Sequence, residues 1–293
     1  MKIKRSFVEI SFDIINILLL TLACLLVITP LLHVLAGSLS TTNALIHSKV
    51  SLWPIGFNLD NYILVFQNDT FWRSFGITLY VVMIGTLLNM ALTIITAYPL
   101  SKDYLKGRKL VMLIVIFTMI FQAPMIPTYL LIKSLGMLNS LWSLIIPGAL
   151  SVFNMILCIT FFRSLPEEMF EAARVDGLSE YRMVWQIALP LSMPIVVTLI
   201  LFYAVAHWNN YYSALLYITD ANLRPLQLYL YMLLSQYNTN DSQSFMSNIV
   251  RSDVSPQGLQ MATIVVATIP VLLIYPFVQK HFIKGSMLGS LKE

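Results

Sequence analysis

Residues 14–36 read IINILLLTLACLLVITPLLHVLA, a run that contains no aspartate, glutamate, lysine or arginine. An α-helix rises about 1.5 Å per residue, so a run of this length can cross the roughly 30 Å apolar core of a bilayer. The whole chain has the same character, because 58% of its 293 residues are apolar and only 11% are charged. A soluble domain carries roughly a quarter charged residues. The sequence therefore predicts an all-α, polytopic membrane protein, whose net charge of +4 describes membrane topology and not an affinity for nucleic acid.

Apolar runs of similar length recur along the chain and predict six transmembrane helices. Together they form a single transmembrane domain over residues 1–293, because the segments between them are too short to fold as independent domains. The expected spans are 14–36, 74–100, 110–132, 140–162, 194–218 and 258–279, with exterior loops at 37–73 and 219–257 and a charged loop at 163–193.

Lysine and arginine are divided unevenly between the two sides that these spans create. Thirteen of the 18 fall in the N-terminal segment, the 101–109 loop, the 163–193 loop and the tail after residue 279, and five fall in the opposite loops. Positively charged loops tend to remain in the cytoplasm. Both termini and the 163–193 loop are therefore predicted to be cytoplasmic, with membrane lipid around the spans.

The spans contain almost no group that could bind a driving ion or perform a reaction. Asp13 lies at the start of the first span, and we interpret His33 and His207 as interfacial or hydrogen-bonded residues. Ion-coupled transporters carry titratable residues at mid-membrane, and an enzyme needs a convergent catalytic set. The chain also lacks the G-x-x-x-x-G-K-[ST] loop that cradles ATP phosphates. We therefore expect no enzyme activity, metal or cofactor in this chain, and energy from another subunit. An ion-coupled secondary transporter remains as an alternative.

The 163–193 loop is unusually rich in charged residues and carries the signals of a helix. Ser164 and Glu167 form an S-x-x-E capping box, which would satisfy the first free amides of a helix. That helix is expected to run to about Asp176 and to stop at Gly177, which can adopt the left-handed conformation without a clash of a Cβ atom.

A second short helix is expected beyond this glycine elbow. Ser179 can cap it, it covers roughly residues 180–188, and Pro190 ends it. In the first helix, Ala172 and Ala173 lack bulk, so a partner surface could approach the backbone closely there. Glu171 beside them offers a carboxylate to a basic residue of that partner. A helix that lies on the bilayer surface is the alternative, although such helices favour lysine and arginine over acidic residues.

A family resemblance rests on this loop. Glu171-Ala172-Ala173, three residues, Gly177, nine residues and then Ile187-x-Leu189-Pro190 resembles the cytoplasmic EAA signature of the permease subunits of binding-protein-dependent ABC importers. The motif has fixed spacing and falls between the fourth and fifth expected spans, on the predicted side. Leu178 departs from the pattern, since many members have a small residue there.

The resemblance implies a type I ABC importer permease fold in a bacterial cytoplasmic membrane. It also implies a heterodimer with a second, homologous permease, two cytosolic ATPase subunits that bind ATP and magnesium, and an exterior solute-binding protein. The residues it implies for coupling to an ATPase are Glu171, Ala172, Ala173, Asp176, Gly177, Ile187, Leu189 and Pro190.

Other segments resemble the sugar-importing branch of this family. Leu189-Pro190-Leu191-Ser192-x-Pro194 and AHWNNYYSALLYI at 206–218 are similar to the maltose-permease branch, and QKHFIKGSMLGSLKE at 279–293 to importers of oligosaccharides. Amides can bind sugar hydroxyls and aromatic rings can stack on sugar rings. A polar and aromatic cluster is therefore expected to line a substrate path: Trp208, Asn209, Asn210, Tyr211 and Tyr212. An aromatic belt with asparagines that join helices, or a permease for a non-sugar solute, remains as an alternative.

Overall fold

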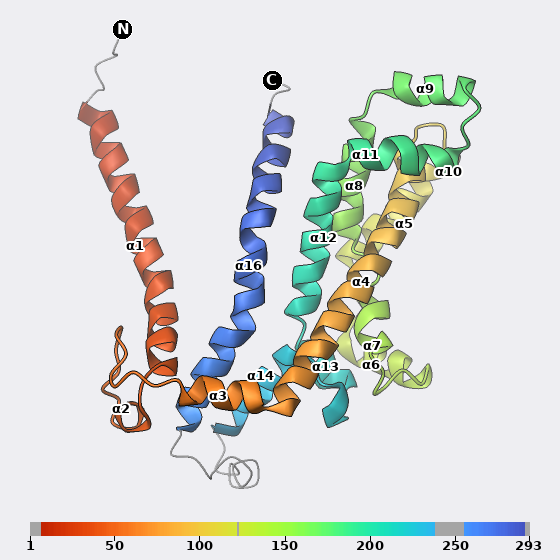
Figure 1. Ribbon diagram of the computed structural model, residues 1–293. Helices are drawn as coiled ribbons and strands as arrows, with labels where there is room; N and C mark the ends of the chain where they lie inside the picture. The colour runs from red at the N-terminus through yellow and green to blue at the C-terminus, as the bar shows by residue number, and fades with distance from the viewer. Residues whose placement is uncertain (1–6, 122, 238–254, 291–293) are drawn as a thin grey trace. The chain divides into compact units, whose positions relative to one another are not determined.

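A computed structural model describes residues 7–121, 123–237 and 255–290, and every regular element in these ranges is helical (Figure 1). The described chain separates into two compact units. The first comprises residues 1–69 and 232–270, and the second comprises residues 70–231 and 271–293. The all-α prediction is therefore confirmed. The 238–254 part of the expected exterior loop 219–257 lies outside the described residues.

The first unit is organised around the end of α1 (Phe7–Ser38), followed by α2 (Thr42–Ile46) and α3 (Asp60–Gln67). Residues 10–32 of α1 expose nearly all of their apolar side chains, as a membrane span does. At its end, the Asn61 amide donates to the Ser38 carbonyl at 3.1 Å, and the Ser38 and Tyr62 hydroxyls lie 2.7 Å apart. A Cβ atom on Gly37 would lie 2.2 Å from the Met261 sulfur in α16 (Pro256–Ser290), so glycine permits this close contact.

The second unit contains four longer helices (Figure 1). They are α4 (Asp69–Ser101), α5 (Arg108–Ile120), α8 (Val152–Arg163) and α12 (Met193–Trp208). Shorter helices lie at their two ends. One end holds α9 (Glu167–Val175), α10 (Glu180–Met183) and α11 (Leu189–Leu191); the other holds α6 (Met125–Ser134), α7 (Trp142–Ile145), α13 (Tyr212–Tyr217) and the start of α14 (Leu226–Tyr237).

Several of the expected spans are interrupted by sharp bends. The α5–α6 pair bends by 110°, and the pair of α7 with its 3₁₀ turn Ile146–Gly148 and α8 bends by 50°. Pro124 lies at the first break, and Pro147 lies in the 3₁₀ turn just before the second; neither has an N–H for the helical ladder. Three described helices are long and apolar enough to cross a membrane alone, or up to six spans if each bent pair counts as one. The exact division into six spans therefore stays a prediction.

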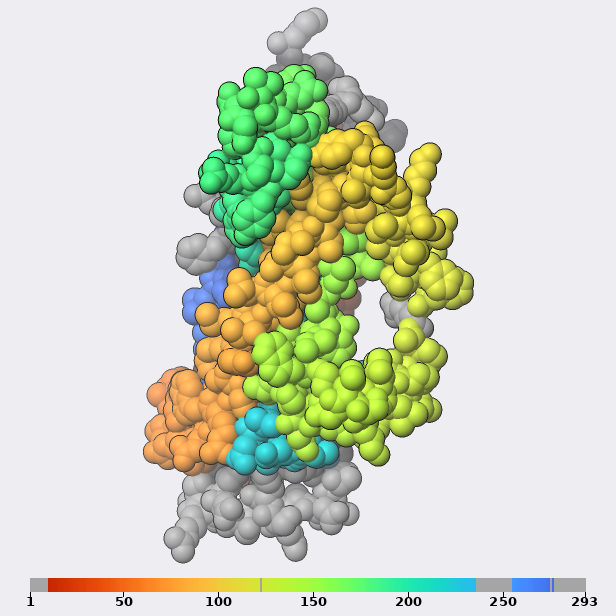
Figure 2. All heavy atoms as spheres, turned by 90° about the vertical axis from the view of Figure 1, so that its right-hand side faces the viewer, coloured from red at the N-terminus to blue at the C-terminus, as the bar shows by residue number. Residues whose placement is uncertain are grey.

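The core of the second unit joins α4, α8 and α12 and reaches up to α9 and α10. Its fully buried members include Ala97, Cys158, Leu199, Phe170 and Met183. In Figure 2, the side of this unit that carries α4 and α5 faces the viewer, and an opening lies beside α5. None of the side chains of α5 is buried. The helices α9 and α10 are thus held by the same apolar cluster that holds the long helices together.

Neutral hydrogen bonds link α4 to its neighbours in the middle of this unit. Asn89 donates to the Gly148 carbonyl at 2.7 Å, and its oxygen lies 3.0 Å from His207 Nε2. One turn along, the Thr93 and Tyr203 hydroxyls are 2.7 Å apart. His207 is therefore a hydrogen-bonded residue, as the sequence predicts, and Asn89 braces the break that precedes α8.

Candidate functional site

The first helix of the 163–193 loop forms without the capping box expected from the sequence. Ser164 directly follows α8, and its hydroxyl donates to the Phe161 carbonyl at 2.8 Å, so it closes the preceding helix and does not open the next. Pro166 stands at the N-cap of α9 without any side-chain cap. The expectation was wrong because the last carbonyls of α8, themselves without helical partners, lie within reach of the hydroxyl.

The glycine elbow is confirmed. Gly177 has a φ of +79°, its N–H donates to the Arg174 carbonyl at 3.0 Å, and the Leu178 N–H donates to the Ala173 carbonyl at 3.0 Å. This pair of bonds is the Schellman motif, in which an apolar residue after the glycine commonly packs back on the helix. Leu178 fills that place and packs against the core, which explains a larger residue there.

The second helix begins as expected and ends later than expected. The Ser179 hydroxyl accepts from the Arg182 N–H at 3.5 Å and caps α10. The chain then continues through a π turn, Val184–Ala188, and through α11, so Pro190 does not end it. Pro190 has no N–H to donate, and a wider turn just before it absorbs the missing bond. The direction changes after α11, by 87° into α12.

The two faces of α9 have different surroundings. Phe170 and Ala173 are buried in the chain's own core, at 1% and 6% exposure, whereas Glu171 and Ala172 are exposed and Val175 is 88% exposed. The expectation that both alanines admit a partner is therefore wrong for Ala173, because this residue already contacts the core of this chain. The outward face includes Glu168, Glu171, Ala172 and Val175, together with exposed Asp176 at the end of the helix.

The remaining residues of the motif fall into the same two groups. Ile187 and Leu189 are partly buried and pack against the core, so they hold the second half of the loop in place. Pro190 and Gly177 are exposed, and a Cβ atom on Gly177 would meet no atom within 4 Å. Glycine is required at this elbow by its backbone conformation and not by crowding.

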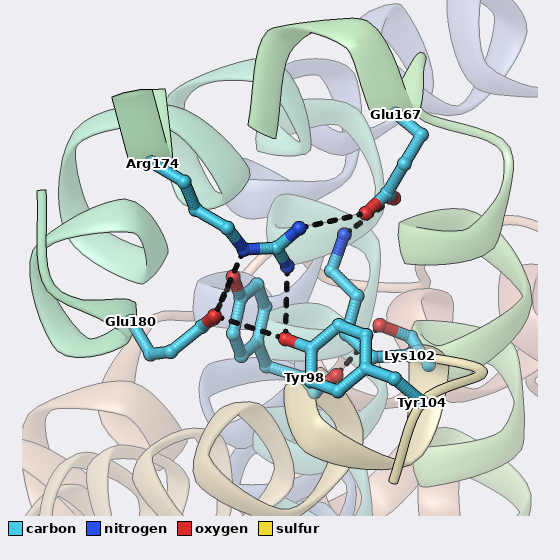
Figure 3. Close-up of polar contacts among 7 residues, drawn as sticks. Tyr98, Lys102, Tyr104, Glu167, Arg174 and Glu180 are labelled. Atoms are coloured by element: carbon cyan, nitrogen blue, oxygen red, sulfur yellow. Dashed lines mark hydrogen bonds and ion pairs between the residues drawn. The ribbon is translucent and has the colours of Figure 1, made fainter. Parts of the chain in front are cut away.

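A buried lysine anchors α9 to the end of α4. Lys102 is 5% exposed, and its Nζ lies 2.7 Å from the Glu167 carboxylate (Figure 3). The same Nζ lies 3.5 Å from the centre of the Phe170 ring. The carboxylate and the ring face both stabilise a cation that has lost its water. Glu167 therefore bonds within this chain.

A second cluster anchors α10 to the same place. Glu180 accepts hydrogen bonds from the Tyr98 and Tyr104 hydroxyls, each at 3.0 Å, and from Arg174 Nε at 3.2 Å (Figure 3). Burial alone would raise the pKa of Glu180, but these three hydrogen bonds together bring its pKa below the ordinary value. Burial, reinforced by the bond to Glu180, raises the pKa of Tyr104. Glu180 is thus held as a carboxylate and the tyrosines as donors.

Three of these anchoring residues were not identified as site residues from the sequence. Tyr98, Lys102 and Tyr104 belong to the end of α4 and to the segment after it, far along the chain from Glu167 and Glu180. In the sequence, Lys102 indicates only on which side of the membrane its loop lies. The available signal was the acidic excess of the 163–193 loop, which required basic or hydrogen-bond-donating partners somewhere on the same side of the membrane.

The structure divides the expected substrate-path cluster. Trp208 is buried with its ring 6.2 Å from that of Phe75, and the Asn210 side chain accepts from the Ser213 N–H at 3.2 Å and so opens α13. The helix expected through 194–218 accordingly ends at Trp208. The exposed members are Asn209, Tyr211, which stacks on Tyr231 at 5.2 Å, and Tyr212, which donates to the Met125 sulfur. A path along these residues stays a prediction.

Comparisons with known proteins agree with this architecture. Residues 90–286 match the family described as binding-protein-dependent transport system inner membrane component. Protein LplC of Bacillus subtilis (strain 168) is 44% identical over 96% of this chain and 95% of its own. From the same organism, the polygalacturonan/rhamnogalacturonan transport system permease protein YtcP is 42% identical over 96% of this chain and 98% of its own.

Solved structures show the same fold. A crystal structure of a bacterial ABC transporter involved in the import of the acidic polysaccharide alginate contains a chain with a TM-score of 0.90 and 31% identity, over 96% of this chain and 100% of that one. A chain of a bacterial alginate ABC transporter in complex with a pentasaccharide-bound periplasmic protein has a TM-score of 0.60 and 17% identity, over 94% of this chain and 96% of that one. The family match covers more than half of the chain, from α4 through the anchored loop to α16, and the chain therefore belongs to the inner membrane components of binding-protein-dependent transport systems.

Proposed function

We propose that this chain is one of two permease subunits of an ATP-driven importer and that its 163–193 loop docks on a cytosolic ATPase subunit. The observation that carries the proposal is the outward face of α9. In a chain of this family, Glu171, Ala172 and Val175 face away from the body of the unit on a helix whose inner face is fixed by core and anchors. An exposed apolar residue beside a small one, rimmed by charge, suits a protein partner.

The surface continues onto the next helix. Tyr181 and Trp185 are 71% and 55% exposed, and the Gly177 elbow between α9 and α10 is open to solvent. Exposed aromatic side chains are enriched in protein interfaces because they bury much area at low entropic cost. ATP is hydrolysed by the partner subunits in this proposal, and the chain itself contributes the membrane path and the docking surface.

The cytoplasmic side is assigned by charge. The 101–109 loop and the 163–193 loop contact each other through Lys102 and Tyr104, so they lie at one end of the unit, and they carry seven of the chain's 18 basic residues. By the positive-inside rule this end is cytoplasmic, and the N- and C-termini are assigned to the same side. The opposite end, with Asn209, Tyr211 and Tyr212, then belongs to the exterior side, where a binding protein delivers the solute.

The substrate class is an oligosaccharide rich in uronic acids. Support comes from relatives: one that is 42% identical is named a polygalacturonan/rhamnogalacturonan permease, and a transporter chain with a TM-score of 0.90 belongs to an alginate importer. In this proposal Asn209, Tyr211 and Tyr212 contribute amide and aromatic contacts to the sugar as it enters the path.

Docking can be tested on the complete transporter, purified through a tag on this chain. Ala172→Trp combined with Glu171→Lys should place bulk and the wrong charge on the docking face, and the ATPase subunits should be lost from the purified complex. Lys106→Glu, an exposed change in the neighbouring 101–109 loop, is the matched control and should retain them. Full retention of the ATPases by the double variant would overturn docking through α9.

The substrate class is tested by uptake. Cells that lack other importers of this kind should take up oligogalacturonate when this chain is produced with its partner subunits and the binding protein encoded beside it. Uptake should stop when this chain alone is deleted. Uptake of neutral maltooligosaccharides at an equal or greater rate would overturn the preference for uronic acids.

A further inference from the structure

Beyond docking, we propose that Tyr98 and Lys102, at the end of α4, are positioning residues that transmit movement of α9 and α10 to α4, so that ATP hydrolysis is coupled to transport. The inference rests on the proposed function, because it takes the 163–193 loop to be the ATPase contact. It assigns to α4 a role that the EAA motif itself does not carry.

The first step of the argument is that α4 holds the loop at two points. Lys102 binds Glu167 and the Phe170 ring in α9, and Tyr98 donates to Glu180 at the start of α10. Tyr98 lies in the last turn of α4, and Lys102 directly follows that helix, with its N–H bonded to the Pro99 carbonyl. These two polar contacts, added to the burial of Phe170 and Met183, fix the direction of α9 and α10 as well as their position.

A bridging residue makes the two contacts act together. Arg174 lies near the end of α9 and pairs with both carboxylates, with Nη1 3.7 Å from Glu167 and Nε 3.2 Å from Glu180. It also donates to the Tyr104 hydroxyl at 3.0 Å and lies over the Tyr104 ring. A displacement of either α9 or α10 therefore strains the contacts of both helices, and the strain reaches the end of α4.

Apolar packing holds one side of α10, because Met183 is buried in the core, and a pocket lies on another side. Between α10 with its π turn and α4 there is a cavity of about 450 Å³, whose lining includes Ile95, Tyr98, Glu180, Tyr181 and Trp185. At this pocket, the hydrogen bonds from Tyr98 and Tyr104 to Glu180 connect α10 to the end of α4. These bonds add a directional, polar connection to the apolar packing of Met183.

Further along, α4 is bonded to the rest of the second unit. Thr93 bonds Tyr203 in α12, Asn89 bonds the Gly148 carbonyl beside the break before α8, and Thr78 accepts from the N–H of Leu226 at the start of α14. These bonds run from the anchored end of α4 to its opposite half. A shift of α4 thus reaches the helix breaks of the unit through contiguous bonds.

The test uses the complete transporter with its binding protein in proteoliposomes. Three quantities are measured: retention of the ATPase subunits, the basal rate of ATP hydrolysis, and oligosaccharide molecules imported per ATP. Lys102→Met and Glu180→Gln should retain the ATPases and keep hydrolysis within about twofold of wild type, because the outward face of α9 is unchanged. Import per ATP should fall at least fivefold in each variant.

Two comparisons separate positioning from general stability. Lys102→Arg keeps the charge and the ring contact, so it should retain most of the import per ATP. The double variant Lys102→Met with Glu167→Gln should be no worse than Lys102→Met alone, because the pair acts as one unit. Lys106→Met, an exposed lysine on the same loop, is the matched control and should match wild type.

The outcomes distinguish this inference from the proposed function. If Ala172→Trp with Glu171→Lys leaves the ATPases bound, docking through α9 fails and the inference fails with it. If that variant releases them as expected, while Lys102→Met and Glu180→Gln import normally per ATP, only the proposed positioning role of Tyr98 and Lys102 is overturned. Loss of the ATPases, or of folded protein, in both Lys102→Met and Glu180→Gln would also overturn it, because the anchor would then serve folding alone.

Discussion

Two junctions attach α4 to its neighbours in the second unit, and they use different chemistry. At the middle of the helix, Asn89 and Thr93 make neutral hydrogen bonds to His207, Gly148 and Tyr203. At its end, Lys102 and Tyr98 meet the carboxylates of α9 and α10. Charged groups are expensive at membrane depth, whereas the half-exposed Glu167 carboxylate keeps part of its hydration. In the predicted topology, the neutral bonds lie within a span and the ion pairs lie at its end, as this cost favours.

The two junctions also differ in how easily their hydrogen-bonded groups can exchange partners. Amides and hydroxyls shielded from water have no competing partners, so exchanging them requires leaving a buried polar group unsatisfied. Glu167 and Glu180 are each 50% exposed and can exchange protein partners for water. The middle junction is therefore suited to hold helices at a fixed distance, and the end junction to change during a cycle of ATP hydrolysis.

The largest expected effect comes from crowding the middle junction. A Cβ atom on Gly85 would lie 2.5 Å from His207 Nε2, so Gly85→Ala must displace the ring that bonds Asn89. Overpacking of this kind costs about 1–3 kcal/mol. Thermal unfolding of the purified protein in detergent should show the loss. Gly76→Ala, on the same helix with no atom within 4 Å of the added carbon, should be neutral or stabilising, and equal losses in both variants would contradict a tight junction at Gly85.

The two junctions should also differ in how their stability responds to salt. Asn89→Leu should destabilise the protein by about 1–3 kcal/mol at any ionic strength, because it leaves the Gly148 carbonyl and His207 without their partner. Glu180→Gln should cost less, and its cost should shrink between about 0.05 and 1 M salt as screening weakens the wild-type pair with Arg174. The measurement is the difference in unfolding temperature from wild type. A salt-independent cost for Glu180→Gln would contradict an exchangeable ionic anchor.

The smallest effect concerns pH. The pKa of Glu180 lies below its ordinary value of 4.5, so its contribution to stability is fully present above that value and is lost as pH falls through the lowered pKa. The stability difference between wild type and Glu180→Gln should therefore stay constant from pH 8 to about pH 5 and decrease only below pH 4.5. A difference that already changes between pH 8 and pH 6 would show that another group titrates in the anchor.

Helix ends illustrate how far local sequence signals reach. Gly177 and Ser179 were assigned correctly, since a left-handed glycine and a serine cap act on amides within a few residues. Ser164 was assigned to the wrong helix, because it stands between two helix ends and both could use its hydroxyl. Pro190 was expected to stop a helix, but a π turn just before it let the chain continue to Leu191.

Hydropathy and cap signals depend on near neighbours in the chain, so the sequence alone predicts a helical membrane protein with an EAA loop on its basic side. Packing in the folded chain buries Ala173 and exposes Ala172, buries Trp208, and pairs Lys102 with Glu167. Such choices depend on which helix packs against which. Groups 65 positions apart leave no periodic trace in a single sequence, and they meet because burying the apolar face of α9 against α4 and α8 brings the lysine and the carboxylate together.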